Sequence, residues 1–227
     1  AAIKAIDVGA AKATPGVVAV FSGSDLGAEL GVMHTPLPPQ MFDLMNRQGR
    51  TVLAEGRARY VGEPVAVVLA EDPRAAVDGA EAVLVEYDPL AVVLDSEAAL
   101  EPGSPLIYPE LGSNLGTRFA RETGDVDGAF KRAAVVLEVK LTNQRLLPVA
   151  MEPRACAAVW DARAKKLTVW GDTQVPHRMR NTLAALLKLE PPRVHLLTAR
   201  VGGGFGAKVP VYSEDVLVCA LAMKLGR

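Results

Sequence analysis

The chain has 227 residues, of which 50% are hydrophobic and 22% charged, and its formal net charge at pH 7 is -1. This length allows one or two domains with a buried core, and the composition is that of an ordinary globular protein. A charge so close to neutral excludes a global basic field, so we expect no nucleic-acid partner. No apolar run approaches the roughly 18 residues of a membrane-spanning helix, so no transmembrane segment is predicted.

The two cysteines and three histidines argue against a metal held by protein side chains. Cys156 and Cys219 lie far apart and form no CxxC pair, which favours buried thiols in a reducing cytoplasm over a zinc site or a disulfide framework. The histidines, at positions 34, 177 and 195, show no metal-ligand spacing. We therefore predict a cytoplasmic location and no protein-ligated metal.

Both ends of the sequence favour the interpretation that it is a piece of a longer polypeptide. It has no initiator Met, and it begins in a periodic segment at 2–6. It ends directly after 215–225, a run that is typical of a helix still packing against something.

The first part of the chain alternates short apolar runs with a helical stretch. β-branched runs at 16–21 and 64–69 predict buried strands, and 82–87 predicts another. The helix predicted over 73–82 opens with a proline, and Asp72 is placed to cap it. A strand, a capped helix and a strand in this order resemble a βαβ unit.

Two irregular stretches divide the chain. The stretch 27–50 is rich in Pro and Met, and a loop of this length is usually functional or mobile. The stretch 101–123 carries several prolines and glycines and is predicted to link two domains. We place the domains at 1–115 and 116–227.

The second part predicts an alternation of short strands and helices. It opens with a short helix that Asp125 or Asp127 could cap. The remaining predicted elements are strands at 134–142, 156–160, 167–170 and 194–197 and an amphipathic helix at 179–189.

A glycine-rich segment, Val-Gly-Gly-Gly-Phe-Gly-Ala-Lys at 201–208, carries the clearest chemical pattern. Glycine lacks a Cβ and reaches positive φ, so consecutive N–H groups can converge on an anion or an oxo group. The alternative is a tight turn that needs glycine for its own geometry. The segment matches neither a Walker loop nor the dinucleotide-binding GxGxxG pattern with its acidic partner.

A second segment, Thr-Gln-Val-Pro-His at 173–177, directly follows a predicted strand. Gln174 offers both a donor and an acceptor, and Pro176 restricts the chain beside it. Gln174 is either a hydrogen-bond donor to a bound ligand or a solvated residue in a turn. For His177 a capping or packing role is favoured over that of a base.

The third segment, 143–154, contains a glutamate between Met and Pro. Glu152 is either a buried acid or a member of an ion pair with Arg145 or Arg154 that holds the loop. We favour the ion pair, because such pairs more often fix conformation than take part in chemistry.

Together these segments resemble one family, the molybdenum hydroxylases that include xanthine, aldehyde and carbon monoxide dehydrogenases. The runs 59–66 and 80–87 look like its α/β hammerhead domain. The runs 143–154, 173–177 and 201–208 look like the start of its molybdopterin-binding region, and they occur in the family's order. The resemblance spans essentially the whole chain.

The resemblance implies an α+β fold, with the hammerhead domain at 1–115 followed by the first part of the molybdopterin-binding domain. It implies a non-covalently bound molybdenum cofactor, molybdopterin cytosine dinucleotide, whose dithiolene holds the metal. Gln174 would donate a hydrogen bond to an oxygen on molybdenum. The backbone of Gly203, Gly204, Phe205 and Gly206 would approach the same centre and the pterin.

The resemblance also implies the activity and the partners. Such enzymes hydroxylate or oxidise a small substrate with water-derived oxygen and pass electrons to [2Fe-2S] and FAD subunits. The expected assembly is a dimer of heterotrimers that includes the remainder of the large subunit. Val209 stands where purine oxidisers place a glutamate, and 208–212 looks most like the carbon monoxide dehydrogenase large subunit.

Neither the family's late catalytic glutamate nor its copper-binding cysteine loop has a counterpart in the sequence. We therefore expect no catalytic residue in this chain and no turnover by it alone. Two alternatives remain. One is a non-catalytic hammerhead scaffold that docks iron-sulfur and flavin subunits; the weaker one is a nucleotide-binding protein that uses the glycine segment for phosphates.

Overall fold

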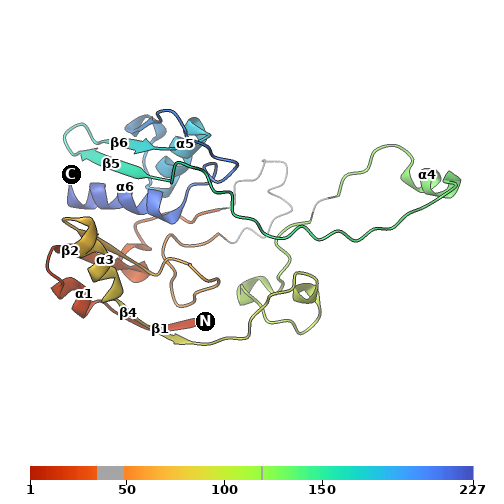
Figure 1. Ribbon diagram of the computed structural model, residues 1–227, viewed down its shortest axis with the longest axis horizontal. Helices are drawn as coiled ribbons and strands as arrows, with labels where there is room; N and C mark the ends of the chain where they lie inside the picture. Colours follow the sequence, from red (N-terminus) through yellow and green to blue (C-terminus); the bar gives the residue numbers. More distant parts are fainter. Residues whose placement is uncertain (35–48, 119, 227) are drawn as a thin grey trace.

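Two lobes and one long arm make up the chain (Figure 1). The structure, a computed structural model, describes residues 1–34, 49–118 and 120–226. Most of the loop predicted over 27–50 therefore lies outside the described residues. Helices and strands are both present in each lobe, so the predicted α+β class is confirmed.

Two separate antiparallel strand pairs form the first lobe. β1 (Ala2–Asp7) pairs with β4 (Leu84–Asp88), and β2 (Val17–Ser22) pairs with β3 (Ala66–Ala70). The predicted βαβ unit is therefore wrong, because β3 and β4 lie in different sheets. Strand periodicity shows which face of a strand is apolar, but it does not specify the edge with which the strand pairs.

The helix between these strands, α3 (Pro73–Glu81), confirms the predicted cap. Asp72 accepts hydrogen bonds from the backbone N–H groups of Arg74 and Ala75 at 2.8 and 3.0 Å. Gly79 lets the helix lie close to the β2–β3 pair, since a Cβ there would come within 2.6 Å of Val17. Two further short helices, α1 (Gly9–Ala13) and α2 (Gly23–Leu26), complete this lobe.

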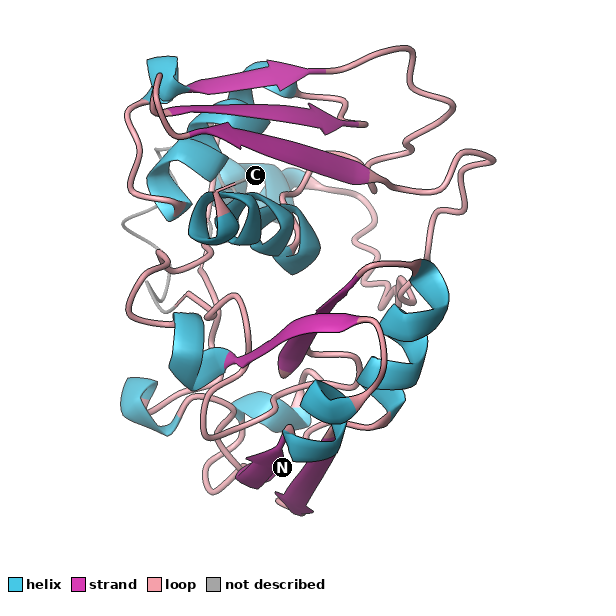
Figure 2. Cartoon of the chain, turned by 90° about the vertical axis from the view of Figure 1, so that its left-hand side faces the viewer, coloured by secondary structure: helices cyan, strands magenta, loops and turns pink. Residues whose placement is uncertain are grey.

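A three-stranded sheet in the order β5-β6-β7 forms the second lobe. β5 (Cys156–Asp161) is antiparallel to β6 (Lys166–Gly171), and β6 is parallel to β7 (Val194–Leu197). The crossover from β6 to β7 contains α5 (Pro176–Leu186), and α6 (Ser213–Leu225) packs against β5. In Figure 2 α6, which carries the C-terminal label, lies between the sheet and the first lobe.

The strands predicted at 156–160, 167–170 and 194–197 are confirmed. The helix predicted over 179–189 instead begins at Pro176 and ends at Leu186. Proline suits the first position of a helix, where its missing N–H group has no intrahelical partner to lose.

Both lobes contribute to one hydrophobic core. Leu167, Leu183 and Val216 of the second lobe are fully buried, and Leu26 and Leu53 of the first lobe pack in the same cluster. The first lobe is therefore anchored to the second by apolar contacts as well as by the chain. The predicted domain boundary at 115 and 116 stays a prediction.

The arm, residues 120–149, leaves the lobes and carries α4 (Val126–Arg132) at its far end (Figure 1). Asp125 caps this helix by accepting a hydrogen bond from Gly128 N at 2.8 Å, as predicted. The strand predicted over 134–142 is wrong, because this segment is paired with no strand in the described part of the chain. A run of alternating apolar residues becomes a strand only where another edge accepts its backbone hydrogen bonds.

Across residues 1–34, 49–118 and 120–226, no helix combines the length and the apolar character needed to span a membrane.

Candidate functional site

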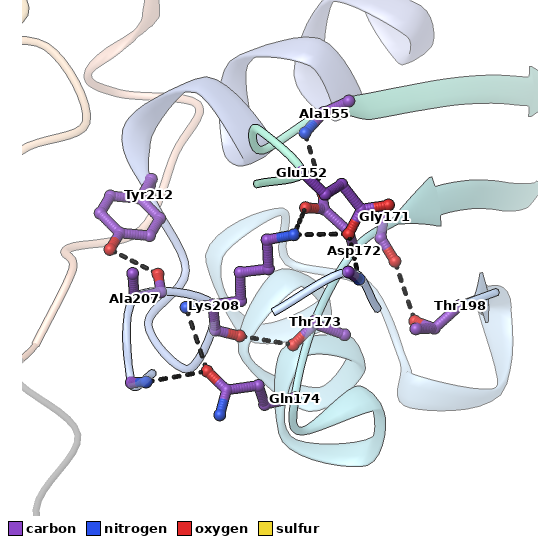
Figure 3. A network of polar contacts seen from close by, with 12 residues as sticks. Glu152, Ala155, Gly171, Asp172, Thr173, Gln174, Thr198, Ala207, Lys208 and Tyr212 are labelled. Atoms are coloured by element: carbon purple, nitrogen blue, oxygen red, sulfur yellow. Dashed lines mark hydrogen bonds and ion pairs between the residues drawn. The ribbon is translucent and has the colours of Figure 1, made fainter. Parts of the chain in front are cut away.

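The structure brings together the three segments that carry the chemical pattern of the sequence (Figure 3). The glycine loop, residues 202–208, follows β7 and precedes α6. It contacts Gln174, at the end of β6, and Glu152, at the end of the arm. Residues far apart along the chain thus form one polar network.

The loop binds the side-chain amide of Gln174 through its oxygen, Oε1. Its Oε1 accepts hydrogen bonds from the backbone N–H groups of Gly206 at 3.1 Å and Lys208 at 3.3 Å. Its backbone N–H donates to the Lys208 carbonyl at 3.0 Å. The residue is exposed, and its Nε2 donates to no other residue that the structure describes. The free end of this amide is therefore a hydrogen-bond donor.

Gly204 is needed because of Gln174. A Cβ at position 204 would lie 2.4 Å from Gln174 Oε1 and 2.5 Å from its Cδ. A larger residue at this position would therefore meet Gln174 before it met any bound ligand. Gly203 and Gly206 have φ values of +95° and +89°, so these two are required by the turn itself. The tight-turn interpretation therefore applies to Gly203 and Gly206, whereas the approach of the loop N–H groups to a bound anion or oxo group stays a prediction.

Phe205 is the unusual residue of the loop. Its φ is +47°, in the left-handed region that residues with a Cβ rarely adopt, and its side chain is 75% exposed. The loop thus combines backbone strain with an exposed aromatic ring, a combination that is typical of sites built for contact.

Lys208 ends the loop as a buried cation. Its side chain is only 1% exposed, and its Nζ lies 2.6 Å from Glu152 Oε2 and 2.8 Å from Asp172 Oδ2. Glu152 therefore forms an ion pair, as predicted, but the predicted partners were wrong. Arg154 instead pairs with Glu214.

The ionisation of this network follows from its contacts. Hydrogen bonds from Lys208 and from Gly202 N–H hold the pKa of Glu152 below its usual value. Burial alone would raise the pKa of Asp172, but hydrogen bonds from Lys208 and Ala155 N–H outweigh it and lower the pKa. Burial alone would lower the pKa of Lys208, but the two carboxylates outweigh it and raise the pKa. All three groups are thus charged at neutral pH.

A second set of contacts supports the loop from the side of α6. The Tyr212 hydroxyl donates to the Ala207 carbonyl at 2.7 Å, and the Arg154 guanidinium lies 3.5 Å from the centre of the Tyr212 ring. Asp215 accepts from Tyr212 N at 2.9 Å and so caps α6, and burial raises the pKa of its carboxyl.

Sequence reasoning missed Lys208, Asp172 and Tyr212 as partners of the loop. No local pattern could have identified the ion pairs of Lys208, because Lys208 meets Glu152 across 56 positions of the chain. Tyr212 lies only five positions from Ala207, but its residue type alone does not indicate this hydrogen bond. His177 is exposed near the start of α5, and its role stays untested.

The part of the chain that the structure describes contains no group of three or more His, Cys, Asp or Glu side chains that could hold a metal ion. The site offers hydrogen-bond donors and a closely approachable backbone instead.

Two family models match the chain. The α/β hammerhead domain of aldehyde oxidase and xanthine dehydrogenase matches residues 1–91. The molybdopterin cofactor-binding domain matches residues 107–227, which include Gln174 and the glycine loop.

Curated relatives match along almost the entire chain. The nicotine 6-hydroxylase large subunit of Paenarthrobacter nicotinovorans is 33% identical over 218 residues, covering 96% of this chain and 26% of that protein. The carbon monoxide dehydrogenase large chain of Afipia carboxidovorans is 34% identical over 239 aligned positions, covering 100% of this chain and 29% of that protein. This chain thus spans less than a third of the length of these relatives.

Solved structures also match this chain over almost its entire length. The crystal structure of quinoline 2-oxidoreductase from Pseudomonas putida 86 has a TM-score of 0.88 at 32% identity, covering 100% of this chain and 28% of that one. A copper- and molybdenum-containing carbon monoxide dehydrogenase has a TM-score of 0.83 at 31% identity, covering 99% of this chain and 29% of that one. With both family models matched and the fold shared, this chain belongs to the molybdenum hydroxylase family, which also includes the aldehyde oxidases and xanthine dehydrogenases.

Proposed function

We propose that this chain forms part of the molybdenum-cofactor-binding subunit of an oxidoreductase. The complete enzyme would hydroxylate or oxidise a small substrate with water-derived oxygen. The observation that carries this proposal is the hydrogen bonding of the Gln174 side-chain amide. Two N–H groups of the glycine loop hold its Oε1, and its Nε2 donates to none of the other described residues.

The described residues fit a molybdenum cofactor. An added Cβ at Gly206 would meet nothing within 4 Å, so space is open beside the loop backbone. Phe205, the residue before Gly206, adds an exposed apolar ring to the loop. Gln174 would hold the cofactor by a hydrogen bond, and Gly203, Gly204, Phe205 and Gly206 would hold it through close backbone approach. When bound, the cofactor would supply the redox centre.

The contribution of this chain is to place donors before the reaction begins. A donor that is already oriented costs no reorganisation when negative charge develops near it, and it acts more strongly where water is excluded. The Gln174 amide meets the first condition, because the loop N–H groups select its orientation. No residue of this chain is proposed as the acid or the base.

The names of the relatives and the residue directly after the loop support a substrate class. The relatives act on carbon monoxide, nicotine or quinoline according to their names. Val209 stands where purine oxidisers carry a glutamate, so we favour carbon monoxide, an aldehyde or an N-heterocycle over a purine.

The proposal extends to the cofactor form and to the partners. We expect the cytosine dinucleotide form of molybdopterin, and a [2Fe-2S] subunit and an FAD subunit in a cytoplasmic dimer of heterotrimers. A relative at 37% identity is itself named as the γ subunit of a dehydrogenase complex, which supports the expectation of separate partner subunits. The remainder of the large subunit would supply the catalytic base.

The alternative hypothesis, a hammerhead scaffold without catalysis, predicts an assembly without molybdenum. The match of residues 107–227 to a cofactor-binding model favours the catalytic hypothesis. Metal analysis of the native assembly separates the two.

The test uses the complete enzyme with Gln174→Ala. Turnover of carbon monoxide, benzaldehyde and quinoline is followed with an artificial electron acceptor, and molybdenum is measured per subunit. We expect normal molybdenum and a kcat lowered about a hundredfold, because one donor to developing charge is lost. Asn181→Ala, which removes an exposed amide on α5, should change neither quantity. Full activity of Gln174→Ala, or a native assembly without molybdenum, contradicts the proposal.

A further inference from the structure

We infer that Lys208 is a positioning residue: its buried ammonium closes the glycine loop and thereby determines which end of the Gln174 amide faces outward. This inference rests on the proposed function, because it concerns the donor that Gln174 would present to the cofactor. The contacts that support it connect Lys208 to the loop, to β6 and to the end of the arm (Figure 3).

The first step is the closure of the loop at its base. Glu152 Oε2 accepts from Gly202 N–H at 2.7 Å, at the start of the loop. The same oxygen lies 2.6 Å from Nζ of Lys208, at the end of the loop. One carboxylate oxygen therefore joins the two ends of the loop.

The second step is the attachment of the loop to β6. Asp172 contacts Lys208 Nζ through Oδ2 at 2.8 Å and accepts from Ala155 N–H through Oδ1 at 2.8 Å. The Lys208 carbonyl accepts from Thr173 Oγ1 at 3.1 Å and from Gln174 N–H at 3.0 Å. Lys208 is thus held at its ammonium and at its carbonyl by consecutive residues at the end of β6.

The third step is the effect on the Gln174 amide. With the backbone of Lys208 held, the N–H groups of Gly206 and Lys208 both point at one atom of Gln174. Two donors can be satisfied by Oε1 but not by the NH₂ group, so only one orientation of the amide is favourable. The opposite orientation would leave the loop N–H groups unpaired and would present an acceptor where the cofactor needs a donor.

A lysine suits this position better than an apolar residue of the same size. Its side chain is 1% exposed, and the carboxylates of Glu152 and Asp172 converge on its tip. Without the ammonium these carboxylates would repel each other and separate, and the ends of the loop would separate with them.

The experiment is a double-substitution cycle between Lys208 and Gln174 in the complete enzyme. Lys208→Met is made alone and in the Gln174→Ala background, and Lys166→Met, at the exposed first residue of β6, is the matched control. The readouts are molybdenum per subunit, the electron paramagnetic resonance signal of the reduced metal centre, and kcat and KM. The substrate is whichever of carbon monoxide, benzaldehyde and quinoline the wild-type enzyme turns over fastest.

Because the effect passes through the Gln174 amide, the cost of Lys208→Met depends on the background. Alone, it lowers kcat per molybdenum about ten- to a hundredfold, the range expected for a misplaced donor. KM changes much less, and the resonance signal shifts in the direction seen for Gln174→Ala. In the Gln174→Ala background the same substitution costs less than about threefold, because no amide remains to be oriented. Lys208→Arg keeps the charge between the carboxylates and recovers part of the lost kcat.

A second variant covers the case in which Lys208→Met fails to fold. Glu152→Gln still accepts from Gly202 N–H but carries no charge, and it follows the same pattern more weakly. Equal costs in both backgrounds overturn the inference, since the network would then act independently of Gln174. A loss of activity that merely tracks lost molybdenum overturns it too, because the role would be structural. If Gln174→Ala itself leaves activity unchanged, it is the proposed function that fails.

Discussion

At the residue scale, the contact between Gly204 and Gln174 determines what the loop can tolerate. The two residues approach so closely that a single added methyl group would overlap the Gln174 amide. Position 204 is not in the left-handed region, so alanine there would suffer from this contact rather than from backbone strain. The site therefore depends on the pair rather than on either residue alone.

Gly204→Ala should destabilise the chain by about 1–2 kcal/mol, because the Gln174 side chain must move away and lose its hydrogen bonds to the two loop N–H groups. In the Gln174→Ala background the same change should cost less than about 1 kcal/mol, because the colliding atoms are gone. Urea unfolding of the four variants measures both values.

Gly116→Ala is the matched control for this cycle. A Cβ at Gly116 would meet nothing within 4 Å, so the change should stay within about 0.5 kcal/mol of zero. Equal costs for Gly204→Ala in both backgrounds would show that Gln174 is not what excludes a larger residue.

The ion-pair network should give stability a defined dependence on pH. The pKa values of Glu152 and Asp172 lie below their ordinary 4.5 and 3.8, so their contribution is complete above those values and is lost as pH falls through the lowered ones. The pKa of Lys208 is raised above 10.5, so its contribution is complete below 10.5 and is lost as pH rises through the raised value.

Wild type and Glu152→Gln should therefore differ in unfolding free energy by a constant amount between about pH 6 and 9. The difference should shrink as the pH falls below 4.5, because a protonated glutamate resembles glutamine. Urea unfolding at stepped pH values measures it. Glu138→Gln, at an exposed position on the arm, should show no such dependence. A difference that grows toward acid pH would contradict the assignment.

At the element scale, helix α3 shows how far a local pattern can determine structure. Its cap lies within three residues of the helix start, so the contact is available as soon as the turn forms. The helix then packs against β2 and β3 through Gly79, a contact that requires the rest of the lobe.

Asp72→Ala should lower the free energy of unfolding by about 1 kcal/mol, because two N–H groups at the start of α3 lose their acceptor. Asp72→Asn should retain most of that stability. Asp78→Ala, on the exposed face of the same helix, serves as the control and should change stability by less than about 0.5 kcal/mol. Denaturant titrations of the three variants measure these free energies of unfolding. An equal loss of stability in Asp72→Ala and Asp78→Ala would argue against the cap.

At the scale of the whole molecule, the shared core and the arm differ in how far their apolar side chains are buried. Apolar residues from both lobes pack together, whereas eight large apolar residues in the 135–149 part of the arm are more than half exposed. These are Val135, Val136, Leu137, Val139, Leu141, Leu146, Leu147 and Val149. One ion pair, Lys140 with Glu97 at 2.7 Å, ties the described arm to the rest of the chain. The arm is therefore the least protected part of the described structure.

Trypsin should accordingly cut the isolated chain in the arm first. The candidate sites are Arg121, Lys131, Arg132, Lys140 and Arg145, all of them exposed. A segment with few packing contacts opens at little free-energy cost, so cleavage there requires no unfolding of the lobes. Mass spectrometry of early digests identifies the cut sites. First cuts within α6 or β6 would show that the arm is better protected than the second lobe.

The sequence by itself determined the features that depend on neighbouring residues. These are the caps of α3 and α4, the strands of the second lobe and the glycine loop. Each follows from residue types within a few positions of one another. The conformational preferences of such neighbouring residues do not depend on the tertiary fold.

Only the tertiary structure decided the contacts between distant segments. It placed β3 and β4 in different sheets, paired 134–142 with no other strand of the described chain, and brought Glu152 to Lys208 across 56 positions. The orientation of the Gln174 amide belongs to the same class, since the two N–H groups that select it lie 32 and 34 positions away. Such contacts form only after the chain has closed long loops, and which of the possible partners meet depends on the packing of the whole fold rather than on any local pattern.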